Sequence, residues 1–271
     1  MHGRGALCAK IEKPSAVSRL DELLPLCDAV MVARGDLGVE LNPEEVPPLQ
    51  KRIVYAARST GKPVIVATQM LESMIESPAP TRAEVSDVAN AVYDGADAVM
   101  LSAETAAGMW PEEAVAMMDR IAVQVETDDS YAGRVHFHDT IPDRTVADSL
   151  SHSCMTIAGN LPIAAVVVFT DSGSTARRVA RERPQTPLMV LTPSTRTARK
   201  VALLWGAHAV TTRDIGSFEE MVAKGKRMAL RHGFGEAGSK LIMVAGVPFG
   251  VPGATNLLHV VTLTGDELKE H

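Results

Sequence analysis

The sequence has few cysteines, few aromatic residues and no long apolar run. Its 271 residues include three cysteines, Cys8, Cys27 and Cys154, without the close spacing of a disulfide framework or a thiolate metal site. Aromatic residues make up 4%, and no basic run offsets the net charge of -6, which argues against a nucleic-acid or acidic-membrane surface. The apolar run before Lys10 is too short for a signal peptide or a membrane span. We therefore expect a cytoplasmic protein with reduced thiols.

Hydrophobic residues, which fill 46% of the positions, are instead arranged in short runs that alternate with amphipathic stretches. This alternation is typical of βα units, and runs rich in Val, Ile and Met predict parallel strands buried on both faces. Thr81 followed by Glu84 forms a capping box and predicts a sharp helix start. In the first series we predict strands over residues 6–11, 29–33, 63–68 and 97–101, and helices over 44–60, 81–94 and 111–126.

A second series of βα units follows a polar segment, residues 128–144, which reads as an interdomain linker. Here we predict strands over residues 163–170, 188–191, 207–211, 240–245 and 259–263, and helices over 145–159, 174–183, 196–205 and 218–232. The first four strands are half of the eight that a closed βα barrel needs, and they would leave two unpaired edges. The predicted fold is therefore half of a TIM (β/α)8 barrel, residues 1–127, followed by a smaller open α/β domain, residues 145–271.

Polar residues follow each of the four runs of the first series, at intervals near the roughly 30 residues of a βα unit. They are Lys10 and Glu12, Arg34 to Asp36, Thr68 and Gln69, and Ser102 and Glu104. The carboxyl ends of parallel strands meet at one face, where the active sites of this architecture are built. We therefore expect the four groups to be neighbours.

Glu12 and Asp36 would be carboxylates on adjacent strands, a natural pair for one Mg²⁺ that keeps water and substrate oxygens as its other ligands. A structural ion pair, of Glu12 with Lys10 or of Asp36 with Arg34, is an equally weighted interpretation of the same residues. Lys10 lies two residues from Glu12 on the same side of the strand, where an ammonium can stabilise a transferring phosphoryl group. Gly35 permits close approach of an anion or simply a tight turn.

Six ordered blocks of the sequence resemble the pyruvate kinase family. They are Ala9 to Pro14 (AKIEKP), Met31 to Gly38 (MVARGDLG), Ala67 to Met74 (ATQMLESM), Pro80 to Glu84 (PTRAE), Ser86 to Val92 (SDVANAV) and Leu101 to Thr105 (LSAET). The resemblance covers essentially the whole chain and is strongest from Lys10 to Pro111. It implies a phosphotransferase that passes the phosphoryl group of phosphoenolpyruvate to ADP, giving pyruvate and ATP in the last step of glycolysis.

The resemblance also implies a role for each strand-end residue. Lys10 would neutralise the phosphoryl group in flight, and Glu12 with Asp36 would hold Mg²⁺ or Mn²⁺. Backbone from Ala33 through Arg34 to Gly35, with Asp36, would bind the carboxylate end of the substrate. Thr68 would contact the substrate near the enolate, and Ser102 and Glu104 would relay the proton.

In the second domain, Thr170, Ser172, Gly173, Ser174 and Thr175 lie between a predicted strand and a helix. Hydroxyls and glycine at a helix N-terminus suit a phosphate, although an ordinary helix cap explains them about twice as readily from the residues alone. The resemblance reverses this balance and implies an effector phosphate site. The segment from residue 246 to 256 lacks the Trp and Arg of relatives that bind a bisphosphorylated sugar, so we expect a sugar or nucleoside monophosphate.

The resemblance places four further barrel strands and a lid domain before Lys10, with the nucleotide contacts and the K⁺ ligands. We therefore expect this chain to be the C-terminal half of such an enzyme, inactive in isolation, with a family-type homotetramer as its assembly. Two alternatives stay open. One is a metal-dependent lyase of the phosphoenolpyruvate/pyruvate barrel group, and the other is a non-catalytic fragment that binds an effector and self-associates.

Overall fold

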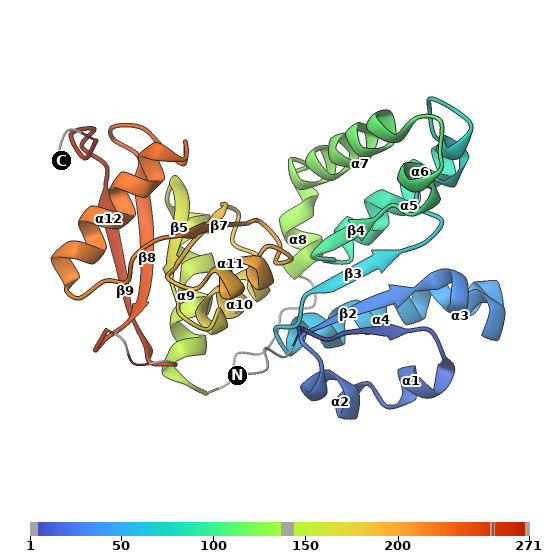
Figure 1. Ribbon diagram of the computed structural model, residues 1–271, viewed down its shortest axis with the longest axis horizontal. Coiled ribbons are helices and arrows are strands. Elements are labelled where there is room, and N and C mark those ends of the chain that lie inside the picture. Colours follow the sequence, from blue (N-terminus) through green and yellow to red (C-terminus); the bar gives the residue numbers. More distant parts are fainter. Residues whose placement is uncertain (1–4, 137–143, 250, 252, 269–271) are drawn as a thin grey trace. The chain divides into compact units, whose positions relative to one another are not determined.

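The computed structural model describes residues 5–136, 144–249, 251 and 253–268, in two compact units (Figure 1). The first unit comprises residues 1–139 and the second residues 140–271. A helix, α8 (Ser130–His136), occupies part of the segment predicted as a linker, and residues 137–143 of that segment lie outside the described residues. The linker bounds 128–144 therefore stay a prediction. No helix in the described ranges is long and apolar enough to cross a membrane.

The sheet of the first unit consists of four parallel strands in sequence order. They are β1 (Cys8–Ile11), β2 (Ala29–Ala33), β3 (Val64–Ala67) and β4 (Ala98–Met100). Val30, Val32, Val64 and Val66 are fully buried, as expected for a parallel sheet covered on both faces. Ile11 pairs with Val32 and Ala33 with Ala67, so the strands end at nearly the same level. The predicted parallel half-barrel strands are confirmed.

Helices connect these strands and cover the sheet. They are α1 (Pro14–Ser18), α2 (Leu20–Leu23), η1 (Leu24–Leu26), α3 (Arg34–Glu40), η2 (Pro43–Glu45), α4 (Val46–Ser59), η3 (Glu72–Ile75), α5 (Arg82–Tyr93), α6 (Ala103–Ala106) and α7 (Pro111–Glu126). Thr81 Oγ1 accepts a hydrogen bond from Glu84 N, and Glu84 returns one to Thr81 N, so the predicted capping box is confirmed. The short helices at strand ends were not predicted, because one helical turn leaves no periodic apolar pattern.

The sheet of the second unit has five strands in the order β7-β6-β5-β8-β9. Four of them are parallel, namely β5 (Ile163–Phe169), β6 (Leu188–Thr192), β7 (Ala207–Thr211) and β8 (Lys240–Gly246). The last, β9 (Thr255–Thr262), runs antiparallel to β8 and begins four residues before the predicted start. Its first residues, Thr255 and Asn256, are polar and give no apolar pattern that would predict a strand. They belong to the strand only because it pairs with β8.

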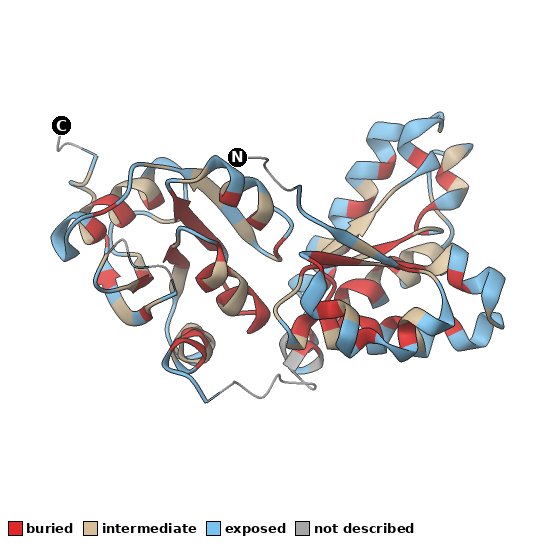
Figure 2. Cartoon of the chain, turned by 60° about the horizontal axis from the view of Figure 1, so that its bottom comes forward, coloured by how far each residue is buried: buried red, intermediate tan, exposed pale blue. Residues whose placement is uncertain are grey.

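Alternate residues of the central strand β5 supply two hydrophobic cores, one on each face. Val167 and Phe169 pack with Met221 and Ala229 of α12 (Phe218–Arg231). Val166 and Val168 pack with residues of α9 (Val146–Asn160), α10 (Ser174–Arg181) and α11 (Thr195–Val201). Buried residues concentrate in the strands and in the helix faces against them (Figure 2). This confirms the predicted open α/β domain.

Candidate functional site

The carboxyl ends of β1 and β2 bring an ammonium between two carboxylates. Lys10 Nζ lies 2.7 Å from Glu12 Oε2 and 3.3 Å from Asp36 Oδ2. The three side chains stay 54%, 37% and 54% exposed, respectively. Hydrogen bonding to Glu12 and then to Asp36 raises the pKa of Lys10, so the ammonium stays protonated. The sequence prediction that these three residues are neighbours is therefore met by the geometry.

The two carboxylates are also placed to share a cation. Both approach the same ammonium nitrogen, so their oxygens converge on one small region. Glu12 Oε2 is buried, and it pairs with the Lys10 ammonium at 2.7 Å. Carboxylate oxygens suit Mg²⁺, which commonly takes one or two of them and keeps waters or substrate phosphates. No group of three or more Asp, Glu, His or Cys suited to a metal occurs in the described ranges, so any ion here would keep such an incomplete protein shell.

One interpretation of the sequence was an ion pair between Arg34 and Asp36. The structure contradicts it, because Arg34 bonds to other partners. Its Nη1 donates to Asp87 Oδ1 at 2.6 Å, and its Nη2 donates to the carbonyl oxygen of Thr68 at 2.6 Å. The Nε also donates to Ala67 O at 3.3 Å, and the side chain is only 10% exposed. Arg34 therefore connects the end of β2 to the loop after β3 and to α5. Asp36 pairs with Lys10 instead.

The loop after β3 has a strained backbone. Thr68 has φ 71° and Gln69 has φ 54°, a left-handed conformation that a β-branched residue such as threonine rarely adopts. Thr68 Oγ1 accepts from Gly35 N at 2.8 Å and donates to Ala67 O at 2.6 Å, while Arg34 holds the Thr68 carbonyl. A Cβ at residue 35 would stand 3.4 Å from Thr68 Oγ1, which is ordinary van der Waals contact, so the loop packs directly against Gly35. Such strain is found mainly at functional sites.

Glu104 is 3% exposed and holds the loops after β3 and β4 together. Its Oε2 accepts from Ser102 N at 2.7 Å and its Oε1 from Leu71 N at 3.3 Å, whereas the side chain of Ser102 is exposed. In the described part of the chain, no hydrogen bond joins Ser102 or Glu104 to Lys10, Glu12 or Asp36. β1 and β4 are the two edges of this sheet, which accounts for the separation. The strand-end residues thus form two groups, and the expectation that all four are neighbours holds only for those on adjacent strands. The Gly35–Thr68 bond joins the end of β2 to the loop after β3.

Sequence reasoning missed Asp87 as the partner of Arg34. Asp87 lies in α5, 53 residues after Arg34, and belongs to one of the blocks that carried the family resemblance. The block was a signal that Asp87 mattered, but nothing local in the sequence connects it to Arg34.

In the second unit, the segment from Thr170 to Thr175 leads from β5 into α10. Gly173 has φ 83° and its N–H donates to Thr170 Oγ1 at 3.0 Å, which closes a turn before the helix. Ser172 Oγ donates to Ser174 Oγ at 3.1 Å. Thr175 Oγ1 lies 2.7 Å from Thr255 Oγ1, and both threonines are buried. Each of the five predicted residues thus belongs to this turn or to the first turn of α10.

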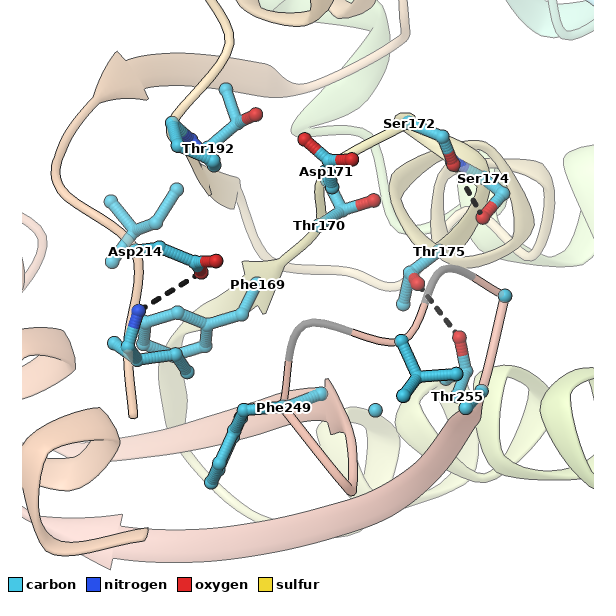
Figure 3. A pocket seen from close by; sticks show the side chains of 18 of the residues that line it. Phe169, Thr170, Asp171, Ser172, Ser174, Thr175, Thr192, Asp214, Phe249 and Thr255 are labelled. Carbon is cyan, nitrogen blue, oxygen red and sulfur yellow. Dashed lines mark hydrogen bonds between the residues drawn. The ribbon is translucent and has the colours of Figure 1, made fainter. Parts of the chain in front are cut away.

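This segment forms one wall of a pocket at the carboxyl ends of β5 and β6 (Figure 3). Its polar lining is mainly hydroxyl groups and two carboxylates, Asp171 and Asp214, and its apolar lining includes Phe169 and Phe249. Arg213 is the only basic residue among the described residues that line it. Asp214 was not predicted, although it follows the adjacent strand β7 and the same strand-end rule would have found it.

The chain is similar to pyruvate kinases in each comparison. Family models described as "Pyruvate kinase, barrel domain" and "Pyruvate kinase, alpha/beta domain" match residues 3–115 and 148–261, respectively. A pyruvate kinase from Methylorubrum extorquens is 51% identical over 99% of this chain and 55% of its own length. One from Corynebacterium glutamicum is 48% identical over 98% of this chain and 55% of its own length. The crystal structure of a pyruvate kinase from Cryptosporidium parvum superposes with a TM-score of 0.87, at 36% identity, over 95% of this chain and 51% of that one.

The chain thus spans about half the length of the relatives it matches. The two family models correspond to the two compact units, and the barrel-domain match contains every strand-end residue of the candidate site. The half-barrel and the open α/β domain predicted from the sequence are the domains that these models describe. By sequence and by fold, this chain is a member of the pyruvate kinase family.

Proposed function

We propose that the chain forms part of a pyruvate kinase site that transfers a phosphoryl group from phosphoenolpyruvate to ADP, giving pyruvate and ATP. The observation that carries the proposal is the convergence of Lys10, Glu12 and Asp36 beside the strained Thr68 loop. A charged ammonium and two carboxylates at strand ends suit phosphoryl transfer, which depends on positioning and electrostatics and needs no covalent protein intermediate.

In this proposal, Glu12 and Asp36 hold Mg²⁺ or Mn²⁺, whose charge would stabilise the phosphoryl oxygens when it is bound. Lys10, fixed between the carboxylates, neutralises the phosphoryl group during transfer. The substrate carboxylate binds at Ala33 to Gly35, where it would replace the bond that Gly35 N and Thr68 Oγ1 now make with each other. Arg34 takes part by holding the Thr68 carbonyl in place.

Proton delivery to the enolate is proposed for the group that follows β4. The Ser102 hydroxyl is exposed and can pass a proton through water. Glu104 is buried with both oxygens accepting backbone N–H groups, so its part is to position Ser102 and the loop after β3. This arrangement favours Ser102 over Glu104 as the group nearer to the transferred proton.

The isolated chain is proposed to have little pyruvate kinase activity. In the described ranges, β1 and β4 each have one strand neighbour and one open edge. The nucleotide contacts and K⁺ ligands belong, in our proposal, to a further half-barrel and lid. The same proposal includes homo-oligomeric assembly and a cytoplasmic location. Size-exclusion chromatography with light scattering would test the assembly.

Two measurements test the active-site proposal. Mn²⁺ binding, followed by electron paramagnetic resonance, should be lost in Glu12→Gln and Asp36→Asn and kept in Glu22→Gln, whose carboxylate makes only an exposed ion pair with Arg19. Pyruvate formation from phosphoenolpyruvate and ADP should be negligible for the chain alone. Turnover comparable with an intact relative would overturn the proposed inactivity, and unchanged Mn²⁺ binding in both variants would overturn the metal site. Pyruvate released from another substrate by cleavage of a carbon–carbon bond, in an assay without phosphoenolpyruvate and ADP, would favour the lyase alternative.

The pocket of the second unit is proposed as an effector site for one phosphate group. Hydroxyls of Thr170, Ser172, Ser174 and Thr175 surround the start of α10, where N–H groups point outward. Arg213 is the single basic residue in the described lining, and the carboxylates of Asp171 and Asp214 disfavour a second phosphate. A sugar or nucleoside monophosphate should therefore bind more tightly than a sugar bisphosphate.

Calorimetry tests the effector proposal. Ser174→Asp should abolish monophosphate binding by repulsion, whereas Ser149→Asp, an exposed change on α9 of the same unit, should leave it unchanged. Tight fructose bisphosphate binding without monophosphate binding, or full affinity in Ser174→Asp, would contradict it. Because the second unit has a complete sheet and its own pocket, monophosphate binding without turnover is the outcome that a non-catalytic, effector-binding fragment predicts.

A further inference from the structure

Two histidines of the second unit face each other at the edge of its sheet, away from the residues of the proposed effector pocket. His208 lies on the edge strand β7 and His232 is the residue at which α12 ends. His208 Nε2 is 3.1 Å from His232 Nδ1, and the ring centroids are 5.0 Å apart. Both side chains are exposed. Their sequence separation of 24 residues gives no metal-site motif, so the pair emerges only from the fold.

The separation of the two nitrogens suits a shared metal ion. Imidazole nitrogens lie about 2.0–2.1 Å from Zn²⁺, so two of them on one ion are about 3.3 Å apart at a tetrahedral angle and about 2.9 Å apart at a right angle. The observed 3.1 Å lies between these values. A modest rotation of the two exposed rings would direct both lone pairs at one ion instead of at each other.

The backbone on both sides of the pair is well fixed. β7 pairs with β6 from Ala207 to Thr211, which holds the Cα of His208 in a regular ladder. His232 N donates to Met228 O, and Gly233, with φ 74°, and Phe234 N–H close the end of α12. The ring of Phe234 also lies against His208, with centroids 5.3 Å apart. The two ligands of an ion would therefore lie on rigid elements. Binding would restrict only the rotation of the two histidine side chains.

The surrounding charges indicate which class of ion fits. His232 lies at the C-terminal end of the 14-residue helix α12, where the helix dipole has its negative end, and this favours a cation. No third His, Cys, Asp or Glu joins the pair in the described ranges, so hard ions that need several carboxylates are excluded. The exposed Arg231 next to the pair opposes ions held by charge alone. Nitrogen ligands favour late first-row divalent ions.

We propose that His208 and His232 form a surface chelate for a late first-row divalent transition-metal ion, with water completing its coordination. Affinity should follow the general order in which Ni²⁺ and Zn²⁺ bind more tightly than Mn²⁺, and Mg²⁺ should not bind. Because the ion would connect β7 to the end of α12, it should stabilise the second unit against unfolding. This site is independent of the proposed catalysis and of the proposed effector.

Zn²⁺ calorimetry on the untagged full chain tests the proposal, with three variants. His208→Asn/His232→Asn should lose the tightest site, and His208→Asn alone should weaken it at least tenfold. His2→Asn/His136→Asn/His138→Asn, which removes three histidines outside the pair, two of them only two residues apart in the sequence, should retain it. Equal Zn²⁺ affinity in the full chain and the double variant, or loss of the tightest site in the triple variant, would overturn the assignment.

A second readout separates chelation from any effect of the substitutions on folding. Zn²⁺ should raise the thermal midpoint of the second unit, followed by Trp205 fluorescence in a Trp110→Phe background, because the sequence has only these two tryptophans. The double variant should show no Zn²⁺-dependent rise, whatever its own midpoint without metal. Mg²⁺ should leave both midpoints unchanged. A Zn²⁺-dependent rise that persists in the double variant would refute the site.

Discussion

Replacing Arg34 by methionine should destabilise the first unit far more than a single surface charge would. Arg34 makes two hydrogen bonds of 2.6 Å, one to the carboxylate of Asp87 and one to the carbonyl of Thr68. Hydrogen bonds that involve a charged group contribute about 1.5–3 kcal/mol each. Asp87 is 37% exposed, so water replaces part of its bond in the variant. We therefore expect a loss of about 3 kcal/mol in the free energy of unfolding.

Urea denaturation of the Trp205→Phe chain measures this loss, because Trp110 then reports on the first unit alone. With a urea dependence of about 1–3 kcal/mol per molar, the midpoint of Arg34→Met should fall by about 1–3 M. Arg34→Lys keeps the charge but not the planar fork, so it should recover less than half of the loss.

Arg19→Met is the matched control, since Arg19 makes an exposed ion pair with Glu22 three residues away. Such pairs contribute at most about 1 kcal/mol, and this variant should shift the midpoint only slightly. If Arg34→Met unfolds at the same urea concentration as Arg19→Met, the hydrogen bonds of Arg34 do not stabilise the Thr68 loop.

Three further predictions concern single side chains. Glu104→Gln turns an amide N–H group toward one of two backbone N–H donors, so we expect a loss of about 1–3 kcal/mol of stability in the Trp110-reported transition. For Glu267, burial alone would raise the pKa, but hydrogen bonds from neighbouring backbone, from Thr264 and from Lys226 lower it to about 2. A lowered carboxylate pKa contributes stability that is present above the unfolded value near 4.5 and lost as the pH falls toward 2. The second unit should therefore lose less stability over that range in Glu267→Gln, and equal losses would contradict the assignment. Burial raises the pKa of Cys154 to about 12, so the native chain should react with a thiol reagent at Cys8, which is exposed, and at Cys154 only after unfolding, as peptide mass mapping would show.

The strands could be predicted because buried parallel strands need continuous apolar runs, and the chain has them. β2 and β7 match their predicted bounds, and α7 begins at the predicted proline. Short elements could not be predicted in this way. α3 has seven residues and α6 four, so neither is long enough to show a helical period of apolar residues. β9 begins at Thr255 because β8 offers it an edge, which is a tertiary cause without a local pattern.

The first group of candidate site residues followed from one rule, that the carboxyl ends of parallel strands converge. The rule predicts from the sequence alone that Lys10, Glu12 and Asp36 lie together, and Lys10 Nζ contacts both carboxylates. The rule says nothing of which partner a charged side chain selects. Arg34 has Asp36 two residues away but bonds to Asp87, because the start of α3 directs its side chain toward β3 and α5. A choice of this kind depends on the relative placement of three βα units.

The conformation of Thr68 is the feature that sequence reasoning was least able to supply, and its cause explains why. A β-branched residue disfavours the left-handed backbone conformation, which costs of order 1–3 kcal/mol in stability. Two contacts from outside its own strand offset that cost, namely the Arg34 guanidinium on its carbonyl and the Gly35 N–H on its hydroxyl. Each contact is individually ordinary. Because they come from the end of β2, the strained loop after β3 and the Lys10 group are parts of one arrangement, and a change to Arg34 or Gly35 should disturb both.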